Sequence, residues 1–383
     1  MAFYISRYKK RKEITFDVEV ITPMFLGSAD QNKAELRAPS IKGMMRFWWR
    51  AVRADADLKK MINEESSIFG GAGDNYGKSS FSVRLHSVRN KRIGKDFLEE
   101  IGKEHNGKRI TYAQNFGLGY LFYSTYTLKN RGVTIKRPYI RPGTKFMLTF
   151  STGKENVLDH VIGSFWLLVN FGGLGTRARR GGGCLSITGI NCDESQKDEL
   201  ERYFMGKDNI ADFLVNGYKE AKAKICPQSK NNNTSAYSTL SGSRFVVNPT
   251  SQHSDWKSAL NEIGLQYREY RLSVKNKLFI GPNFGFPVMH HRFRTRMIGR
   301  TSKETLERRS SPLIIKTIRV NGVYYPLVIV LGGRLLPTDG KIVKDIKQNN
   351  RWVYSGQSSN ENLNHITAFL KTLGQKGYTT ISL

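Results

Sequence analysis

The spacing of apolar residues predicts strands and helices along the whole chain. In the first half, strict alternation of apolar and polar residues predicts a half-buried strand from Glu13 to Thr22, ended by Pro23. The predicted elements that follow are a helix from Ile41 to about Leu58, strands over Ser80–Val88 and Lys145–Ser151, a helix over Val157–Phe171 and a strand that starts at Cys184. This β-α-β-β-α-β order is that of the ferredoxin-like unit.

The same order of predicted elements returns in the second half, without readable sequence repetition. Pro312–Arg319 and Val323–Leu331 predict two strands joined across Asn321-Gly322, the strongest hairpin signal in the chain. The elements predicted around them are a strand over Arg244–Asn248, a helix over Ser254–Val274, a helix over Asn360–Gly374 and a closing strand over Tyr378–Leu383. The sequence therefore predicts an α+β fold of tandem ferredoxin-like (RRM-like) domains with basic loop insertions.

Composition suggests where the two domains divide. The stretch from Cys226 to Ser238 is polar and low in complexity, which is typical of a connection between domains. A second Gly- and Ser-rich stretch, Ser66–Ser80, is predicted to be a loop. The predicted domains are an N-terminal ferredoxin-like domain carrying a glycine-rich loop in residues 1–205, a linker region in 206–240 and a C-terminal ferredoxin-like domain in 241–383.

The helix predicted from Ile41, with Ser40 as its N-cap, carries a core-facing apolar stripe beside a row of cations. Winding it at about 100° per residue gathers the cations in one arc, with a tryptophan at the edge. The residues of this cationic row are Lys42, Arg46, Trp49, Arg50 and Arg53. Such a row is often simply solvated. These cations, however, have no acidic partner four residues away, and a bound phosphate chain would relieve their repulsion.

A glycine-rich loop, Gly172–Cys184, holds six glycines and three arginines but no carboxylate. Glycine lets a backbone approach a ligand closely, and arginine presents a charged planar fork that suits phosphate. The loop follows a predicted helix and precedes a predicted strand, the reverse of a dinucleotide-binding loop, and it lacks the Gly-Lys-Ser/Thr ending of a Walker loop. The expected phosphate contacts are Gly173, Gly175, Arg177, Arg179 and Arg180. The alternative is a mobile, solvated connection.

Charge narrows the choice of partner. The chain has 61 Lys and Arg against 32 Asp and Glu, a formal net charge of +29, which favours nucleic acid. A membrane-surface protein is disfavoured because the charge is spread along the whole chain, and no apolar run reaches the roughly 20 residues of a spanning helix. The 3 cysteines have neither disulfide nor zinc-site spacing, so we expect no metal, no cofactor and a cytoplasmic location.

A second basic insertion lies between the helix and the hairpin of the second half. Arginines alternate there with other residues around Phe293, a combination that suits single-stranded nucleic acid. The candidate contacts in this segment are Arg292, Arg294 and Arg296. A solvated loop is again the alternative.

Several of these segments together resemble a known family. The matching motifs, in order, are Thr22-Pro-Met-Phe-Leu-Gly27, Pro39-Ser-Ile-Lys-Gly-Met-Met-Arg-Phe-Trp-Trp-Arg50, Ile68-Phe-Gly-Gly71, the loop Gly172–Gly183 and Arg309-Ser-Ser-Pro-Leu313. In this order and spacing they resemble the RAMP superfamily of CRISPR proteins. Within it, the helix with paired tryptophans resembles the first subunit of the Cmr complex, the type III-B RNA-guided effector.

The resemblance implies tandem ferredoxin-like domains and a non-catalytic RNA-binding role in antiviral defence. The implied partners are CRISPR guide RNA, target single-stranded RNA or both, and other Cmr complex subunits.

Two alternatives stay open. RAMP relatives include endoribonucleases, which use a histidine or an Asp in the loop after the first strand. Asp30 occupies such a loop, and the histidines are His86, His105, His160, His253, His290, His291 and His365. Alternatively Trp48 and Trp49 dock a neighbouring protein subunit and RNA contact is incidental, although Trp48 fits the core-facing stripe.

Overall fold

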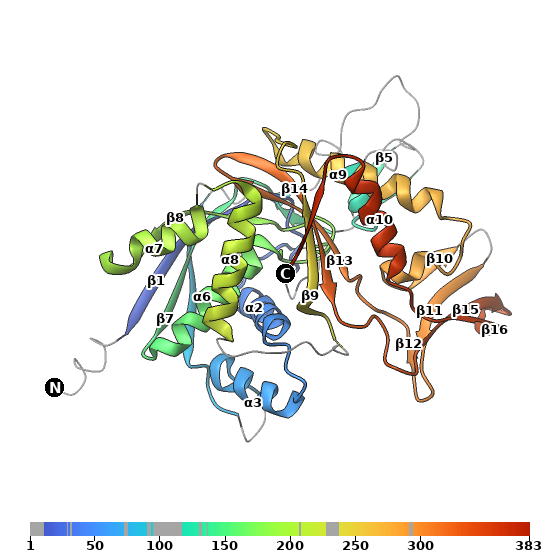
Figure 1. The fold of residues 1–383 in the computed structure, drawn as a ribbon, viewed down its shortest axis with the longest axis horizontal. Coiled ribbons are helices and arrows are strands. Elements are labelled where there is room, and N and C mark those ends of the chain that lie inside the picture. Colours follow the sequence, from blue (N-terminus) through green and yellow to red (C-terminus); the bar gives the residue numbers. More distant parts are fainter. Residues whose placement is uncertain are drawn as a thin grey trace.

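The computed structural model describes residues 11–28, 30, 33–72, 76–89, 93–94, 117–129, 132–135, 137–206, 208–226, 237–290 and 294–383. In these parts the chain forms two four-stranded antiparallel sheets with helices packed on them, and a further sheet that extends from the second (Figure 1).

The first sheet has the strand order β2-β7-β1-β8, with every neighbouring pair antiparallel. Its strands are β1 (Lys12–Val20), β2 (Phe81–Arg89), β7 (Lys145–Thr152) and β8 (Leu185–Asn191). Helices α2 (Ala38–Arg53) and α6 (Glu155–Asn170) complete a ferredoxin-like unit. Alternate residues of β1 point into the core, where the Phe16 ring packs against Phe150 and Phe165.

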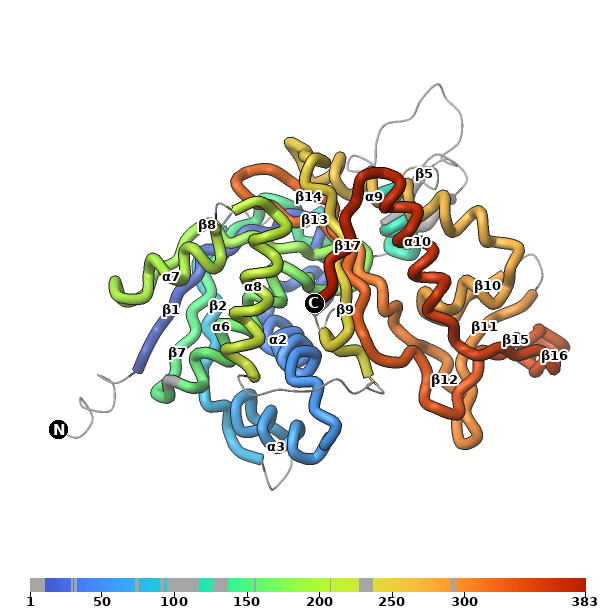
Figure 2. The backbone as a smooth tube through the Cα atoms, viewed as in Figure 1, coloured from blue at the N-terminus to red at the C-terminus, as the bar shows by residue number. Residues whose placement is uncertain are grey.

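The second sheet repeats this topology in the order β13-β14-β9-β17. Its strands are β9 (Thr239–Val247), β13 (Leu313–Val320), β14 (Val323–Gly332) and β17 (Thr379–Ser382), and its helices are α9 (Trp256–Ser273) and α10 (Asn364–Gly374). The hairpin forms as expected, with Asn321 and Gly322 at φ 51° and 78°, the left-handed values of a type I′ turn. The C-terminus ends in the middle of the molecule, where β17 pairs with β9 (Figure 2). The prediction of tandem ferredoxin-like domains is confirmed.

A third, five-stranded sheet is inserted into the second unit and extends from it (Figure 1). Its strands are β10 (Val288–His290), β11 (Thr295–Arg300), β12 (Thr305–Leu306), β15 (Lys341–Gln348) and β16 (Arg351–Ser359). The predicted basic loop therefore contains strands, and β15 and β16 were not predicted. A small hydrophobic core of its own, including Phe286, Met297 and Ile342, lies at this sheet.

The first helical region differs from its prediction. Helix α2 ends at Arg53 because Ala54 adopts a left-handed conformation (φ 43°) and donates its N–H to the Arg50 carbonyl. A new helix, α3 (Leu58–Phe69), starts after Asp57, whose side chain accepts from the Lys60 N–H. Residues 54–57 of the predicted helix are therefore not helical, whereas the start of the predicted loop, residues 66–69, belongs to α3. At the N-terminus of α2, Arg37 and not Ser40 is the N-cap residue, without a side-chain capping bond.

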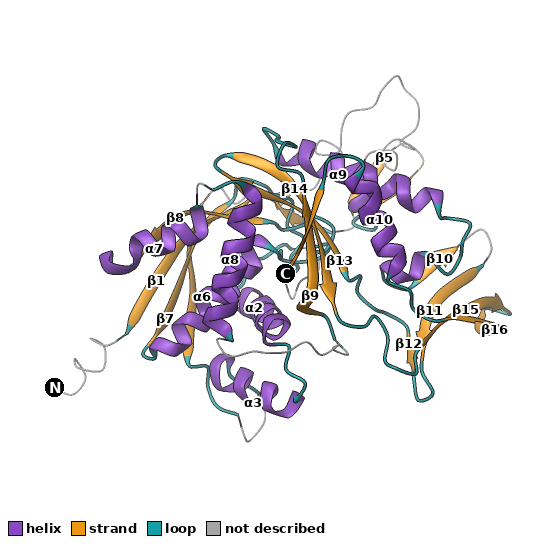
Figure 3. Ribbon diagram, in the orientation of Figure 1, coloured by secondary structure: helices purple, strands orange, loops and turns teal. Residues whose placement is uncertain are grey.

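The remaining elements cover the two units. They are α5 (Gly117–Leu121), α7 (Glu194–Met205), α8 (Ile210–Ile225), the 3₁₀ turn η1 (Gly281–Phe284) and the short pairs β3 (Ile93–Gly94) with β6 (Tyr139–Ile140) and β4 (Tyr126–Lys129) with β5 (Gly132–Ile135). Helix α8, inside the predicted linker region, packs on α6 closely enough that a Cβ on Gly163 would lie 3.1 Å from the Ala221 carbonyl oxygen (Figure 3). Where the domains divide stays a prediction. Among the described helices, none is long and apolar enough to cross a membrane.

The two units are joined through Lys316, a fully buried lysine on β13. Its Nζ donates to the Val169 carbonyl oxygen at 2.7 Å, near the C-terminal end of α6. Burial in the junction lowers the pKa of Lys316 to about 8.

This lowered pKa predicts a pH-dependent cost of keeping Lys316 charged. Below pH 8 Lys316 is protonated in both the folded and the unfolded chain, so the folded state carries the full free-energy cost of burying the charge. Between about pH 8 and 10.5 the folded chain loses this proton while the unfolded chain keeps it, so that cost disappears. Relative to Lys316→Met, the wild-type free energy of unfolding should therefore rise by up to about 3 kcal/mol across this window. Urea unfolding of both proteins measures the difference, and parallel pH curves would contradict it.

Candidate nucleic-acid interface

The glycine-rich loop is tightly folded. Its ends are tied together by the Leu174 N–H, which donates to the Gly183 carbonyl oxygen at 3.0 Å, and Gly183 donates to Pro23. Gly175 and Gly183 have φ values of 86° and 62°, and a Cβ on Gly183 would lie 2.0 Å from the Leu174 carbonyl oxygen. These glycines are therefore required by the loop's own geometry, which argues against a merely mobile connection.

The loop forms one wall of a pocket of about 560 Å³ between the two ferredoxin-like units. The first unit also contributes α2, and the second contributes the segments around 284–287 and 309–314. The lining residues are Met44, Phe47, Trp48, Gly172, Gly173, Gly175, Arg177, Ala178, Arg179, Arg180, Phe284, Gly285, Phe286, Pro287, Arg309, Ser310, Ser311 and Ile314. The structure thus brings together all five loop residues predicted as phosphate contacts.

Two of the loop arginines also form hydrogen bonds to the second unit. Arg179 donates its Nη1 to the Ser311 carbonyl oxygen, and its guanidinium lies 5.5 Å from the Phe47 ring centroid. Arg180 donates to the Leu313 carbonyl oxygen at 2.7 Å and to the Tyr267 hydroxyl at 3.2 Å. The backbone joins as well, since the Ile315 N–H donates to the Arg179 carbonyl oxygen. Both side chains are held in fixed directions, as a preorganised anion site requires.

Charge in the pocket is not balanced. Among the residues described as lining it, four are arginines and none is a carboxylate. Burial, reinforced by Arg180, lowers the pKa of Arg177 to about 10, and burial with Arg180 and Arg309 nearby lowers that of Arg179 to about 10. The buried Arg177 Nε has no hydrogen-bond acceptor in the described structure. Such an arrangement is stabilised by an anion that enters the pocket.

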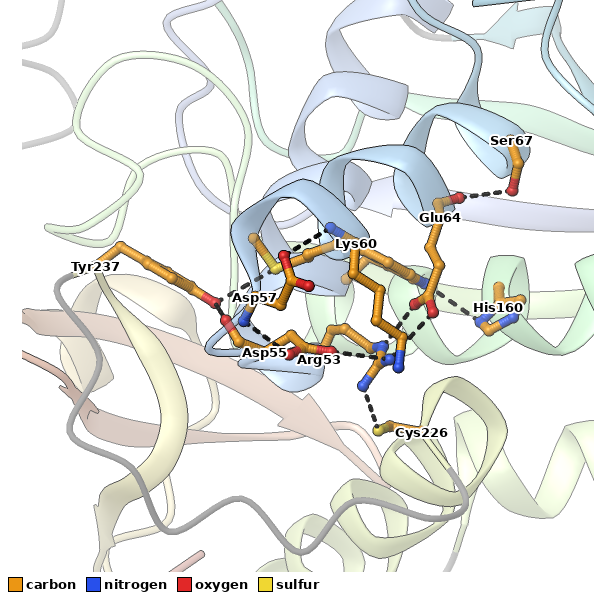
Figure 4. Close-up of polar contacts among 11 residues, drawn as sticks. Arg53, Asp55, Asp57, Lys60, Glu64, Ser67, His160, Cys226 and Tyr237 are labelled. Carbon is orange, nitrogen blue, oxygen red and sulfur yellow. Dashed lines mark hydrogen bonds and ion pairs between the residues drawn. The ribbon is translucent and has the colours of Figure 1, made fainter.

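The cationic row of α2 is in a different situation, because α3 supplies the carboxylates that the sequence pattern did not show. Arg50 Nη1 lies 2.7 Å from the buried Glu65 carboxylate, which also binds Arg46. Arg53 pairs with Glu64 and Asp55 and donates to the Cys226 sulfur at 3.3 Å (Figure 4). Within α2 the row has no acidic partner four residues away, as noted from the sequence, but carboxylates from outside α2 pair with Arg46, Arg50 and Arg53, so no bound phosphate is needed to relieve their repulsion. RNA contact by these arginines stays a prediction.

Lys42 and Trp49, the other members of the row, also make intramolecular contacts. Lys42 Nζ lies 4.9 Å from the Phe81 ring centroid, and burial together with Arg46 lowers its pKa. Trp49 is 1% exposed and donates its Nε1 to His160 Nδ1 at 3.2 Å. Trp49 was predicted to stack on a base. Instead its ring is part of the core, because neither ring face is exposed. Trp48, also 1% exposed, is in the core as expected, and neither ring is available as an anchor for a neighbouring subunit.

Two of the candidate arginines of the second basic insertion, Arg294 and Arg296, are not among the residues described as lining the pocket. Arg296 pairs with the buried Asp345 at 3.0 Å and lies 5.0 Å from the Trp352 ring centroid. Arg294 is exposed before β11, and Arg292 lies outside the described residues. RNA contact by Arg294 and Arg296 stays a prediction.

Sequence reasoning did not assign Phe47 or the two segments of the second unit to the site. Gly285 is at φ 105°, where a Cβ would lie 2.8 Å from the Ser311 nitrogen, so the two segments approach very closely. The available signal was the Arg309-Ser-Ser-Pro-Leu313 motif, noted above only as part of a resemblance.

The residues considered for catalysis are scattered. Asp30 is an exposed loop residue whose carboxylate lies 3.6 Å from Lys33 Nζ. His290, whose pKa is lowered by burial and by Arg271 and Lys344, stands in β10. His253 Nε2 contacts both Ser251 Oγ and Glu262 Oε2, so one ring nitrogen takes both contacts and no Ser-His-Glu relay forms.

The other histidines are equally dispersed. His86 contacts Thr149, His160 accepts from Trp49 and His365 is in α10, while His105 and His291 lie outside the described residues. No histidine or Asp is among the residues described as lining the pocket. No group of three His, Cys, Asp or Glu side chains able to hold a metal ion occurs within the described ranges.

Comparison with known proteins identifies the family. The RAMP superfamily model matches residues 17–186. The CRISPR system Cmr subunit Cmr1-2 of Pyrococcus furiosus is 30% identical over 184 residues, 46% of this chain and 95% of the relative, and subunit Cmr1-1 is 27% identical over 320 residues, 82% and 86%.

Solved structures share the fold. The apo crystal structure of Cmr1 from P. furiosus superposes with a TM-score of 0.61 at 20% identity, covering 96% of this chain and 98% of that one. A chain of the type III-B Cmr-beta complex bound to cognate target RNA gives 0.53 at 13% identity, covering 95% and 99%. The chain belongs to the RAMP superfamily, and within it is a Cmr1-like protein.

Proposed function

We propose that this chain is a non-catalytic, RNA-binding subunit of a cytoplasmic type III-B Cmr complex, and that the arginine-lined pocket holds the phosphate backbone of guide or target RNA. The observation that carries the proposal is a pocket described as lined by four arginines and no carboxylate. Arginine forks bind phosphate oxygens strongly in such a partly buried setting. The names of the curated relatives, both Cmr subunits, and the net charge of +29 support the same partners.

Crosslinking of single-stranded RNA to the purified chain tests this proposal. Ultraviolet crosslinks mapped by mass spectrometry should fall in peptides of the loop 172–183 and of 309–314, since both line the pocket. The labelled RNA should be recovered at full length, because no histidine or Asp is described in the pocket wall. Crosslinks confined to α3 or to the third sheet would contradict the proposed site.

Recovery of shortened RNA in the same incubation would favour the alternative, a RAMP-type endoribonuclease. Asp30→Ala and His290→Ala would then show which residue carries the cleavage activity. Both residues are described, and neither is among those that line the pocket.

A further inference from the structure

The pocket has a second wall that phosphate binding does not require. Besides the arginines, its lining includes aromatic and apolar residues from both units: Met44, Phe47, Trp48, Phe284, Phe286, Pro287 and Ile314. Phe284 and Phe286 are 3% and 5% exposed, whereas Phe47 is half-buried. The Arg179 guanidinium over the Phe47 ring adds a planar surface where the two walls meet. A site for phosphate alone has no use for this apolar wall.

Two buried donors point to a polar ligand beside that wall. Trp48 is 1% exposed and lines the pocket, yet its indole Nε1 has no acceptor in the described structure. A Cβ at position 172 would lie 2.4 Å from this nitrogen, so only glycine fits beside it at that position. Arg177 Nε is the second donor without an acceptor. Buried donors are rarely left unpaired in folded proteins, and a bound ligand with acceptor atoms would satisfy both.

We propose that the pocket takes one whole nucleotide of the bound strand, its base against the apolar wall and its phosphate against Arg177 and Arg179. This inference rests on the proposed function and adds a base contact to it. A base supplies a planar apolar face for Phe47 and the Arg179 guanidinium, and ring acceptors for Trp48 Nε1. The volume of about 560 Å³ is within the range of small-ligand pockets.

Two RNA-like probes of equal length and charge separate base from backbone binding. One is a single-stranded oligouridylate of about 12 nucleotides, and the other is the same ribose-phosphate chain without bases. Wild-type protein should bind the base-bearing chain about tenfold tighter, the size of one stacking contact. Phe47→Leu should remove most of this preference, because it should lower the affinity for the base-bearing chain much more than the affinity for the abasic chain. Phe47→Tyr, which keeps the ring, should retain the preference.

The outcomes separate this inference from the proposed function. Equal binding of both probes by wild-type protein, or a preference that survives in Phe47→Leu, overturns the nucleotide pocket while RNA binding stands. Failure of both probes to bind wild-type protein overturns the proposed function itself. If Phe47→Leu unfolds more readily, fluorescence of 2-aminopurine within the oligouridylate reports the base directly in wild-type protein: quenching on binding supports burial, and unchanged emission contradicts it.

Discussion

Replacing Arg177 and Arg179 together by glutamine should weaken binding of single-stranded RNA by about 100-fold at low salt. It should also reduce the slope of log K against log salt by about 1.4, since each phosphate contact on a single strand contributes roughly 0.7. Both side chains line the pocket, and no carboxylate is described there to compensate their charge. Titrations at several salt concentrations give affinity and slope from the same data.

The matched control for the double arginine variant removes the same charge elsewhere. Lys59 and Lys60 are exposed on α3 and do not line the described pocket, so Lys59→Gln with Lys60→Gln should leave the slope nearly unchanged. Equal slopes for the two double variants would mean that net charge, not the pocket, determines binding. Thermal unfolding of both proteins shows whether the lost Arg179 contact to Ser311 has altered the fold.

Glu65→Gln should lower the free energy of unfolding by about 3 kcal/mol. The Glu65 side chain is 6% exposed and accepts from Arg46 and Arg50, which are 30% and 37% exposed, so its loss leaves two partly buried cations unpaired. Because both arginines are partly exposed, we expect the loss of unfolding free energy to lie at the lower end of the range for broken buried ion pairs. Urea unfolding measures it. A change below 1 kcal/mol would show that water compensates the two arginines.

Glu64→Gln is the control for Glu65→Gln on the same helix. Glu64 is 38% exposed and pairs with Arg53, so its replacement should cost no more than about 1 kcal/mol. Neither variant should steepen the salt slope of RNA binding. A steeper slope in Glu65→Gln would show that Arg46 and Arg50, once released from Glu65, do reach RNA.

Elements with strong local signals could be predicted from the sequence. Asn321-Gly322 specified its hairpin because two adjacent residues must adopt left-handed conformations, and the alternation in β1 reflects one buried face. Strands β15 and β16 gave a weaker signal. Most residues of β16 are exposed, and β15 pairs with β11, about 40 to 50 residues earlier in the chain.

The candidate site was predictable in part for the same reason. Glycine and arginine density marked the loop, whose geometry depends on residues within it. The helix arginines were misassigned because their partner Glu65 is 19 residues from Arg46, on a helix whose start was not foreseen. Trp49 likewise faces His160, a partner 111 positions away. Periodicity within one helix cannot show a partner supplied by another.

The bond from the Ile315 N–H to the Arg179 carbonyl oxygen has a consequence for how the chain tolerates insertions and deletions. It fixes the loop in register with β13, while the Thr176 N–H fixes it to Phe25 in the first unit. Because backbone hydrogen bonds hold both Thr176 and Arg179, one residue added or lost between them would move Arg177 and Arg179 relative to each other. In the part of the chain that the structure describes, no such pair of backbone bonds attaches the turn between β15 and β16, at Asn349 and Asn350. Among relatives, we expect loop length to be constant between the attachments and variable at that turn.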